Sequence, residues 1–182
     1  MIYIQTPQLL IRDLKPTDWE DLLRYRSLPE VCEFQWYDPY NEDKAKEFCI
    51  RQSTAEFPIE GQRKQFAIIL EDKVIGDVGL KPESYDKRIV EFGVSMNPTY
   101  QWKGYAQEAL QIVFKTLFEQ YDVHRIFAIT SQENHACIRL LENLAMTREW
   151  TMTQSFWNKG KRHDEYLYAI LQSNYLLIPN NG

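Results

Sequence analysis

One loop, Gln101-Trp102-Lys103-Gly104-Tyr105-Ala106, contains two small residues and a basic residue. It follows Asn97-Pro98, which ends a predicted strand, and precedes a long amphipathic stretch. The first turn of a helix presents backbone N–H groups without intrahelical partners and the positive end of the helix dipole. The small residues Gly104 and Ala106 let the phosphates of a ligand approach that backbone, and Lys103 adds a positive charge. The loop is therefore predicted to bind a pyrophosphate group.

The cysteines and histidines are too scattered to predict a metal centre or a disulfide framework. The three cysteines, Cys32, Cys49 and Cys137, form no C-x-x-C pair, and the three histidines are equally dispersed. His135 lies two residues before Cys137, but two candidate ligands do not make a metal site. We predict no metal.

The composition is that of a globular domain with a sizeable core. The chain has 182 residues, of which 44% are hydrophobic and 26% charged, and no repeat or linker divides it, so one domain over residues 1–182 is predicted. A net charge of -5 argues against a surface that coats nucleic acid. No apolar run reaches membrane-spanning length and residues 1–12 lack a signal-peptide pattern, so we expect a cytoplasmic protein without a membrane partner.

The elements that must position the loop follow from hydrophobic periodicity, turn residues and caps. Strands are predicted over Gln8–Arg12, Phe66–Leu70, Val74–Leu80, Ile89–Met96, Arg125–Thr130, Thr147–Phe156 and Tyr166–Leu171. Helices are predicted from Thr17 as N-cap to about Leu28, from Asn41 onward, over Tyr105–Glu119, and from about Asn134 to Leu144. Hairpin strands mixed with strand–helix–strand crossovers predict an α/β fold of the mixed α+β kind: a mixed, mostly antiparallel sheet of about seven strands flanked by about four helices.

The loop and its context resemble the GCN5-related N-acetyltransferase (GNAT) family. Members carry the pattern Q/R-x-x-G-x-G/A between the fourth strand and the third helix, and Gln101, Gly104 and Ala106 match it. The block from His124 to Met146 is similar to the family's fifth strand and fourth helix, and the opening from Thr6 to Arg12 resembles the RimJ/RimL-type branch, which includes protein N-terminal acetyltransferases. The resemblance covers nearly the whole chain.

The resemblance implies that acetyl-CoA is the acyl donor and that a neutral amine attacks its thioester directly in a ternary complex. Backbone N–H groups at the strand end, near Val94, Ser95 and Met96, would polarise the thioester carbonyl. The other cofactor contacts that the resemblance implies come from Gln101, Trp102, Lys103, Gly104, Tyr105, Ala106, Asn134 and Cys137.

Two side chains are candidates for proton transfer in that reaction. Glu91 is the candidate base, directly or through water; the alternative is a carboxylate that faces solvent or pairs with a basic neighbour. Cys137, where relatives carry Ser, is the candidate acid near the cofactor sulfur, although a thiol donates hydrogen bonds poorly. Otherwise it is a small apolar residue, or a nucleophile activated by the helix N-terminus. Asn134 is a ligand of the pantetheine arm, a helix N-cap, or both.

Trp102 stands at a position that is very often Gly in relatives. A bulky residue with positive φ is strained, so we expect an ordinary backbone conformation with the ring on the surface. The alternative is a ring that lines the edge of the cofactor.

The acceptor is predicted to be a primary amine that binds beside the aromatic residues Phe34, Trp36 and Tyr37, which otherwise seal the core. It is a protein N-terminal amine, as on a ribosomal protein, or alternatively a small-molecule amine such as a polyamine or an antibiotic; the net acidity suits any cationic acceptor. A non-catalytic CoA-binding module is a third alternative, because Trp102 and Cys137 depart from the family pattern. A dinucleotide-binding domain is disfavoured, since no G-x-G-x-x-G follows the first strand. The sequence is compatible with a homodimer but does not demand one.

Overall fold

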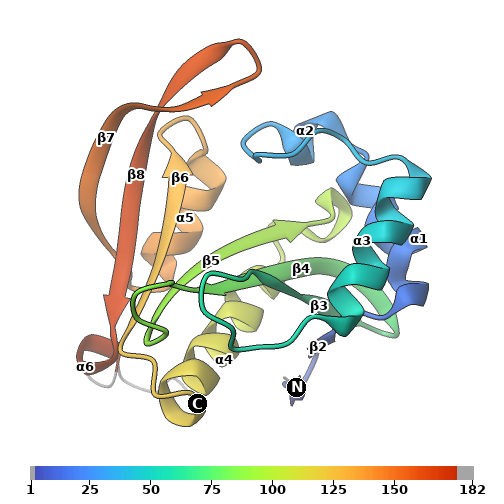
Figure 1. Cartoon of the computed structure of the whole chain (residues 1–182), viewed down its shortest axis with the longest axis horizontal. Helices are drawn as coiled ribbons and strands as arrows, with labels where there is room; N and C mark the ends of the chain where they lie inside the picture. The colour runs from blue at the N-terminus through green and yellow to red at the C-terminus, as the bar shows by residue number, and fades with distance from the viewer. Residues whose placement is uncertain (1–2, 176–182) are drawn as a thin grey trace.

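One sheet forms the framework of the molecule in a computed structural model that describes residues 3–175 (Figure 1). Its strands lie in the order β1-β2-β3-β4-β5-β6-β8-β7, and all neighbours are antiparallel except the parallel pair β5–β6. The strands are β1 (Tyr3–Gln5), β2 (Leu10–Asp13), β3 (Lys64–Leu70), β4 (Lys73–Pro82), β5 (Ile89–Met96), β6 (Arg125–Ser131), β7 (Thr147–Asn158) and β8 (Lys161–Leu171). The predicted mixed, mostly antiparallel sheet is confirmed. The strand that escaped prediction is β1, because three residues are too few to show a period.

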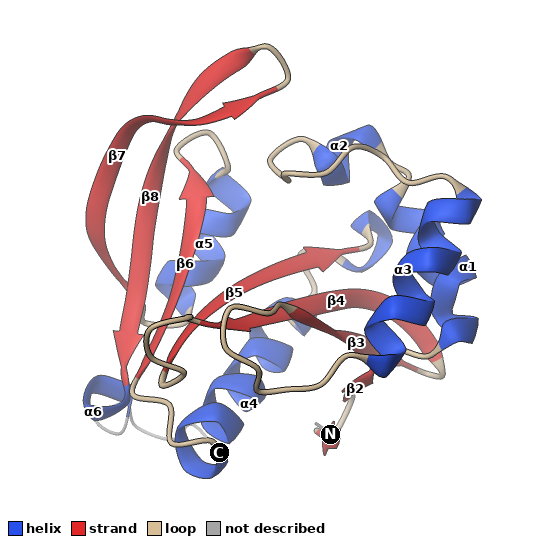
Figure 2. Ribbon diagram, in the orientation of Figure 1, coloured by secondary structure: helices blue, strands red, loops and turns tan. Residues whose placement is uncertain are grey.

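Within the described residues, six α-helices flank the sheet (Figure 2). They are α1 (Trp19–Arg26), α2 (Pro29–Cys32), α3 (Glu42–Thr54), α4 (Tyr105–Gln120), α5 (His135–Asn143) and α6 (Gln172–Tyr175), and two 3-10 turns, η1 (Pro16–Asp18) and η2 (Pro98–Tyr100), precede α1 and α4. The four longer helices are those predicted, whereas α2 and α6 have four residues each and carry no helical period. No helix in residues 3–175 is both long and apolar enough to cross a membrane.

The first predicted helix, from Thr17 to about Leu28, is divided into two pieces, the 3-10 turn η1 and the helix α1. The 3-10 turn η1 ends at Asp18 and α1 follows it, so the prediction of Thr17 as N-cap is wrong. The Asp18 carboxylate instead accepts a hydrogen bond from the Lys15 amide at 2.7 Å, which tightens the turn before the helix. Pro29 opens α2 and separates it from α1, because proline suits the first turn of a helix but cannot donate an N–H in its interior.

Alternate residues of β3 enter two separate cores, since successive strand side chains point to opposite faces. Phe66 and Ile68 belong to the core that includes α4 and α5, whereas Ala67 and Ile69 belong to the core that includes α1 and α3. Both faces of β3 are therefore covered by a core.

The parallel strands β5 and β6 separate soon after they begin, as Figures 1 and 2 show. They pair only between Ile89–Glu91 and Arg125–Phe127. Beyond that point β5 continues beside β4 and β6 continues beside β8. The separation opens a wedge at the carboxyl ends of two parallel strands, where ligands of α/β sheets commonly bind. The chain leaves these two strand ends to form the N-termini of α4 and α5.

β7 and β8 form a long curved hairpin at one edge of the sheet (Figure 1). The hairpin lies next to β6 and extends beyond the end of that strand, on one side of the wedge. The turn predicted at Asn158-Lys159-Gly160 lies at its tip, where Lys159 and Gly160 have φ of 48° and 83°. Both strands are longer than predicted, because the polar residues Lys161 to Glu165 show no apolar alternation but still pair across the hairpin.

Candidate active site

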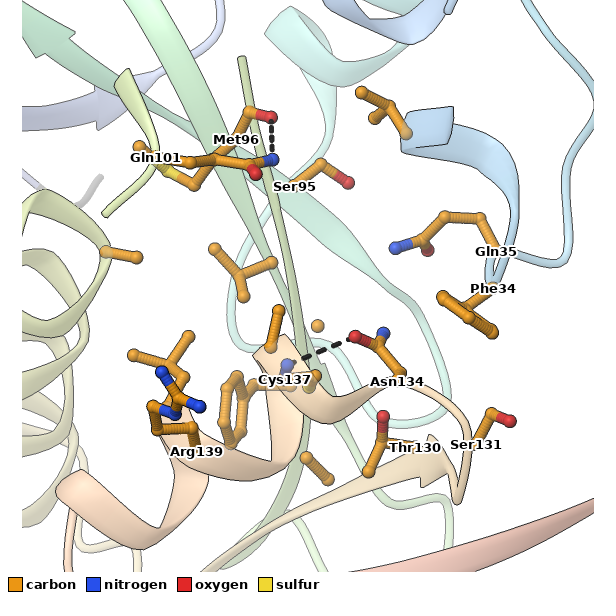
Figure 3. A pocket seen from close by; sticks show the side chains of 18 of the residues that line it. Phe34, Gln35, Ser95, Met96, Gln101, Thr130, Ser131, Asn134, Cys137 and Arg139 are labelled. Atoms are coloured by element: carbon orange, nitrogen blue, oxygen red, sulfur yellow. Dashed lines mark hydrogen bonds between the residues drawn. The ribbon is translucent and has the colours of Figure 1, made fainter. Parts of the chain in front are cut away.

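A cavity of about 500 Å³ occupies the wedge between β5 and β6. Its walls come from the second half of β5, the loop into α4, the end of β6, the first turns of α5, the α2 segment and the β7–β8 hairpin. This volume is within the range of small-molecule and cofactor sites. Figure 3 shows side chains from these elements facing one another across the cavity.

The N-terminus of α4 forms one end of the cavity. The residues Gly104, Tyr105, Ala106 and Gln107 line it, and Gly104 at the N-cap has φ of 85° and provides no side-chain cap. Within the described residues, the N–H groups of Tyr105, Ala106 and Gln107 have no hydrogen-bond acceptor. A Cβ placed on Gly104 would meet no heavy atom within 4 Å, so the space beside the N-cap is open. Free amides, positive dipole and open space together fit a pyrophosphate.

Gln101 ties the loop to the end of β5. Its Nε2 donates to the Met96 carbonyl at 3.2 Å (Figure 3). The side chain therefore fixes the distance between the helix N-terminus and the strand. Lys103, in contrast, places its Nζ 5.6 Å from the ring centre of Tyr100 and is not among the residues that line the cavity.

Trp102 corrects one of our expectations. Its φ is 62°, so the prediction of an ordinary backbone conformation is wrong. The chain must turn between η2 and α4, and two residues of this short loop, Trp102 and Gly104, adopt left-handed conformations to do so. The side chain is 72% exposed and borders the cavity. Its ring centre lies 5.8 Å from the guanidinium of Arg139, which sequence reasoning did not single out.

The second half of β5 presents backbone donors to the cavity. Val94, Ser95 and Met96 all line it. The Asn97 amide donates to the Ile75 carbonyl of β4 at 2.9 Å, and backbone groups of successive strand residues point in opposite directions. The N–H groups of Val94 and Met96 therefore point away from β4 and into the wedge. Donors directed in this way are able to polarise a carbonyl group that enters the wedge.

Asn134 and Cys137 lie at the start of α5 on the opposite wall. Asn134 caps the helix, with its Oδ1 accepting from the Cys137 amide at 3.1 Å, and its side chain also borders the cavity (Figure 3). Burial raises the pKa of the Cys137 thiol, and a hydrogen bond with Thr130 opposes that rise only in part. The thiol is therefore held in its neutral form, which suits a proton donor and disfavours a thiolate nucleophile.

Glu91, the predicted base, does not reach the cavity. Its Oε1 accepts from Arg63 at 2.5 Å and its Oε2 from Lys81 at 3.4 Å. The residue belongs to the part of β5 that is still paired with β6, opposite Phe127, before the strands separate. This placement matches the alternative of a carboxylate paired with basic neighbours and disfavours a role in proton transfer.

Two other carboxylates line the cavity and were missed by the sequence analysis. Glu165 of β8 lies opposite Ser131 of β6, and its Oε2 accepts from Ser155 at 2.7 Å. Its Oε1 has no partner among residues 3–175. Glu30 of α2 also borders the cavity, and within the same residues it forms no ion pair. Only the three-dimensional structure brings these two carboxylates to the cavity, because neither residue lies near the Gly104 loop in the sequence.

The predicted aromatic residues of the acceptor region have three different environments. Phe34 lines the cavity. Trp36 is 69% exposed and does not line it. Tyr37 is buried, and its hydroxyl lies 3.1 Å from Ser95 Oγ, so it supports β5 from behind the cavity wall. Desolvation raises the pKa of Tyr37, which keeps this hydroxyl protonated.

The tip of the β7–β8 hairpin is bound to the segment after α2. The Asn158 amide Nδ2 donates to the Glu33 carbonyl at 3.0 Å and to the Gln35 carbonyl at 3.4 Å. Lys159 Nζ donates to the Cys32 carbonyl at 2.8 Å. These contacts join the two walls that carry Glu30 and Glu165 and hold them at a fixed separation. We name them the hairpin clamp.

The residues that the structure describes contain no group of three or more His, Cys, Asp or Glu side chains placed to hold a metal ion.

Comparisons with known proteins agree with this geometry. Residues 8–147 match the family model of the acetyltransferase (GNAT) domain. The chain is 30% identical over 176 residues to the uncharacterized N-acetyltransferase YnaD of Bacillus subtilis (strain 168). The aligned residues cover 96% of this chain and 99% of that protein. A GNAT-family acetyltransferase structure from Bacillus anthracis matches with a TM-score of 0.86 at 30% identity, over 94% of this chain and 99% of that one. Spermidine N-acetyltransferase from Vibrio cholerae, in complex with CoA and spermine, matches with a TM-score of 0.80 at 24% identity, over 94% and 99% of the two chains.

Proposed function

The chain belongs to the GNAT acetyltransferase family, and from this premise we propose that it acetylates a cationic primary amine held between Glu30 and Glu165. It is an acyltransferase, and acetyl-CoA is its co-substrate. The observation that carries the proposal is the polarity of the cavity. Free helix amides lie at one end and two carboxylates without basic partners line the other part of its wall.

The cofactor end would bind acetyl-CoA mainly through the backbone. The amides of Tyr105, Ala106 and Gln107 would receive the pyrophosphate, and the pantetheine arm would follow the wedge past Asn134. The N–H groups of Val94 and Met96 would then face the thioester carbonyl and stabilise the negative charge that develops on its oxygen. Acetyl-CoA supplies the activated acetyl group.

Proton transfer would use side chains that line the cavity. We assign Glu165 as the base that takes the proton of the amine, since its Oε1 has no protein partner within the described residues. As the amine nitrogen bonds to the acetyl carbon and the thioester C–S bond breaks, the neutral Cys137 thiol would give its proton to the leaving CoA thiolate. The resulting Cys137 thiolate would regain a proton from solvent before the next turnover. Ser95, supported by Tyr37, would hold the acceptor side of β5 in place.

A polyamine is the acceptor that this cavity supports best. Two carboxylates suit an acceptor with more than one positive charge. The hairpin clamp holds the walls that carry Glu30 and Glu165 together, so both carboxylates can contact one acceptor. The Vibrio cholerae relative, whose structure holds spermine, supports the same class. A protein N-terminal amine is the second candidate, favoured by the RimJ/RimL-like opening from Thr6 to Arg12.

Release of free thiol from acetyl-CoA tests the proposal. We expect turnover with spermidine and much slower turnover with a peptide that carries a free N-terminal amine. Glu165→Gln should slow turnover with both, because it removes the proposed base. Faster turnover with the peptide would reassign the acceptor, and acetyl-CoA binding without turnover on either substrate would contradict the proposed acceptor chemistry.

A further inference from the structure

The outer half of β5, which carries the backbone donors of the cavity, is bonded to the sheet along one edge only. Past Glu91 it no longer pairs with β6, and within the described residues β4 is its one neighbouring strand. The N–H groups of Val94 and Met96 can stabilise an oxyanion only when they point at it with little error. A strand bonded along one edge is held less firmly than one bonded along both, so these donors need support from outside the sheet.

A buried ion pair lies directly across from this part of β5. Asp77 of β4 is the cross-strand partner of Ser95, and its carboxylate accepts two hydrogen bonds from Arg26 of α1, Nη2 to Oδ1 at 2.6 Å and Nε to Oδ2 at 3.1 Å. The Tyr25 hydroxyl donates to the same carboxylate at 2.5 Å, and burial raises the pKa of this tyrosine, so its hydroxyl stays a donor. Arg26 and Asp77 are each only 1% exposed, so water does not compete for these bonds.

Three aromatic rings surround the guanidinium of Arg26. Its Cζ lies 4.6 Å from the ring centres of Tyr37 and Phe48 and 5.3 Å from that of Tyr40, whose hydroxyl accepts from Nη1 at 3.2 Å. We call the Arg26–Asp77 pair and these three rings the Arg26 cage. Apolar groups of the same volume often stabilise a core as well as a buried ion pair does, whereas charge-assisted bonds fix side chains in one orientation. Orientation is therefore what the Arg26 cage provides beyond stability.

Tyr37 connects the Arg26 cage to β5. Its ring faces the guanidinium, and its hydroxyl lies 3.1 Å from Ser95 Oγ, which is hydrogen-bond distance. Ser95 borders the cavity between the two donor residues Val94 and Met96 (Figure 3). A continuous chain of contacts thus runs from α1 through the cage to the outer half of β5.

We propose that the Arg26 cage, acting through Tyr37 and Ser95, fixes the direction in which the N–H groups of Val94 and Met96 point at the thioester carbonyl. Arg26 and Tyr37 are positioning residues, since they reach the reacting groups only through Ser95 and the strand that carries it. Because an oxyanion forms only in the transition state, their loss should lower kcat and leave the affinity for CoA unchanged. The inference rests on the proposed function, because it assigns the support of the same donors.

A double-mutant cycle of Tyr37→Phe and Ser95→Ala tests this inference. Each substitution removes one side of the same hydrogen bond, and Tyr37→Phe keeps the ring against the guanidinium. Each should lower kcat about fivefold, as expected for one hydrogen bond, without changing the CoA affinity measured by calorimetry. The double variant should be no slower than Ser95→Ala alone, because the second substitution has no bond left to remove.

Infrared difference spectroscopy of bound acetyl-CoA, labelled with carbon-13 at the thioester carbonyl, gives a readout that needs no amine. Donors aimed at the carbonyl oxygen lower its stretching frequency, so the unmodified protein should shift the band downward from its position in water. Tyr37→Phe should reduce that shift. If spermidine gave no turnover, the proposed acceptor would fail, while the carbonyl band would still decide whether the donors are positioned in this way.

Tyr168→Phe is the matched control. It removes the hydroxyl of another buried tyrosine, which donates to Glu142 Oε1 at 3.2 Å, and neither residue lines the cavity. This variant should keep the kcat and the carbonyl frequency of the unmodified protein, even where its melting temperature falls. Arg26→Lys retains the charge but loses the planar fork, so it should lower both the melting temperature and kcat.

Three results would overturn the inference. Additive losses of kcat in the cycle would show that Tyr37 does not act through Ser95. An unchanged kcat and an unchanged carbonyl band in Tyr37→Phe would remove this tyrosine from the positioning of β5. A folded Arg26→Lys variant with the kcat of the unmodified protein would limit the ion pair to a structural role.

Discussion

The two ends of the cavity are built in different ways. The cofactor end consists mainly of backbone groups from one continuous segment, Val94 to Gln107, in which a strand end, a turn and a helix N-terminus follow one another. The acceptor end consists of side chains from α2, β6, β8 and the hairpin, which are brought together by the sheet. Substitutions in the first end should therefore affect CoA, and those in the second should affect the amine.

The largest expected effect comes from Gly104→Glu. It places a Cβ at φ of 85° and a negative charge in front of the free amides of α4, so CoA affinity should fall at least about a hundredfold in calorimetry. Gly160→Glu is the matched control, since Gly160 has φ of 83° and also has open space around its Cβ position. That variant should keep its CoA affinity and change only the KM of the amine. Equal loss of CoA affinity in both variants would contradict the division of the cavity.

Glu165→Gln should lower kcat about a hundredfold, because an amide cannot accept the amine proton. CoA affinity should not change, since the residue belongs to the acceptor end. Glu91→Gln is the comparison variant. It removes the negative charge that pairs with Arg63 and Lys81, so we expect a lower melting temperature and a nearly unchanged kcat. A larger kcat loss for Glu91→Gln than for Glu165→Gln would restore the assignment made from the sequence.

The same contrast explains what could be predicted from the sequence. The position of the Gly104 loop between a strand and a helix could be predicted, because the strand, turn and helix are neighbours in the chain and each has a local signal. The mixed sheet and its four longer helices followed from periodicity in the same way. Glu165 gave no such signal, because it becomes a cavity residue only through its register with Ser131 across β6 and β8. The ion pairs that join Glu91 to Arg63 and Lys81 could not be predicted, because they form only when β5 takes its place in the sheet.

The backbone of Trp102 illustrates a different limit. Residue preferences argue against a left-handed tryptophan, and they were overruled by the geometry of a short turn between η2 and α4. Local preference is a weak guide where tertiary structure fixes the path of the chain.

Asn158→Ala tests the hairpin clamp and should have a smaller effect. It removes two hydrogen bonds to the carbonyls of Glu33 and Gln35 and loosens the wall that carries Glu165. The KM for spermidine should rise about fivefold with CoA affinity unchanged, which corresponds to the loss of about one hydrogen bond's net contribution. Ser173→Ala, at an exposed hydroxyl of α6 at the other end of β8 from the hairpin tip, is the control. A change in CoA affinity would show that the hairpin also shapes the cofactor end.

The smallest effect concerns Cys137, where the two ends meet. Because burial raises the pKa of its thiol, little thiolate exists near pH 7, and the fraction increases only as the pH rises toward that elevated value. Alkylation by iodoacetamide, followed by mass spectrometry of the Cys137 peptide, should therefore be slower at pH 7 than that of free cysteine and should accelerate through pH 9. Saturating CoA should slow it further, since the thiol borders the cavity. Rapid alkylation at pH 7 would instead reveal a thiolate stabilised by the N-terminus of α5, and covalent catalysis would replace proton donation as the role of this residue.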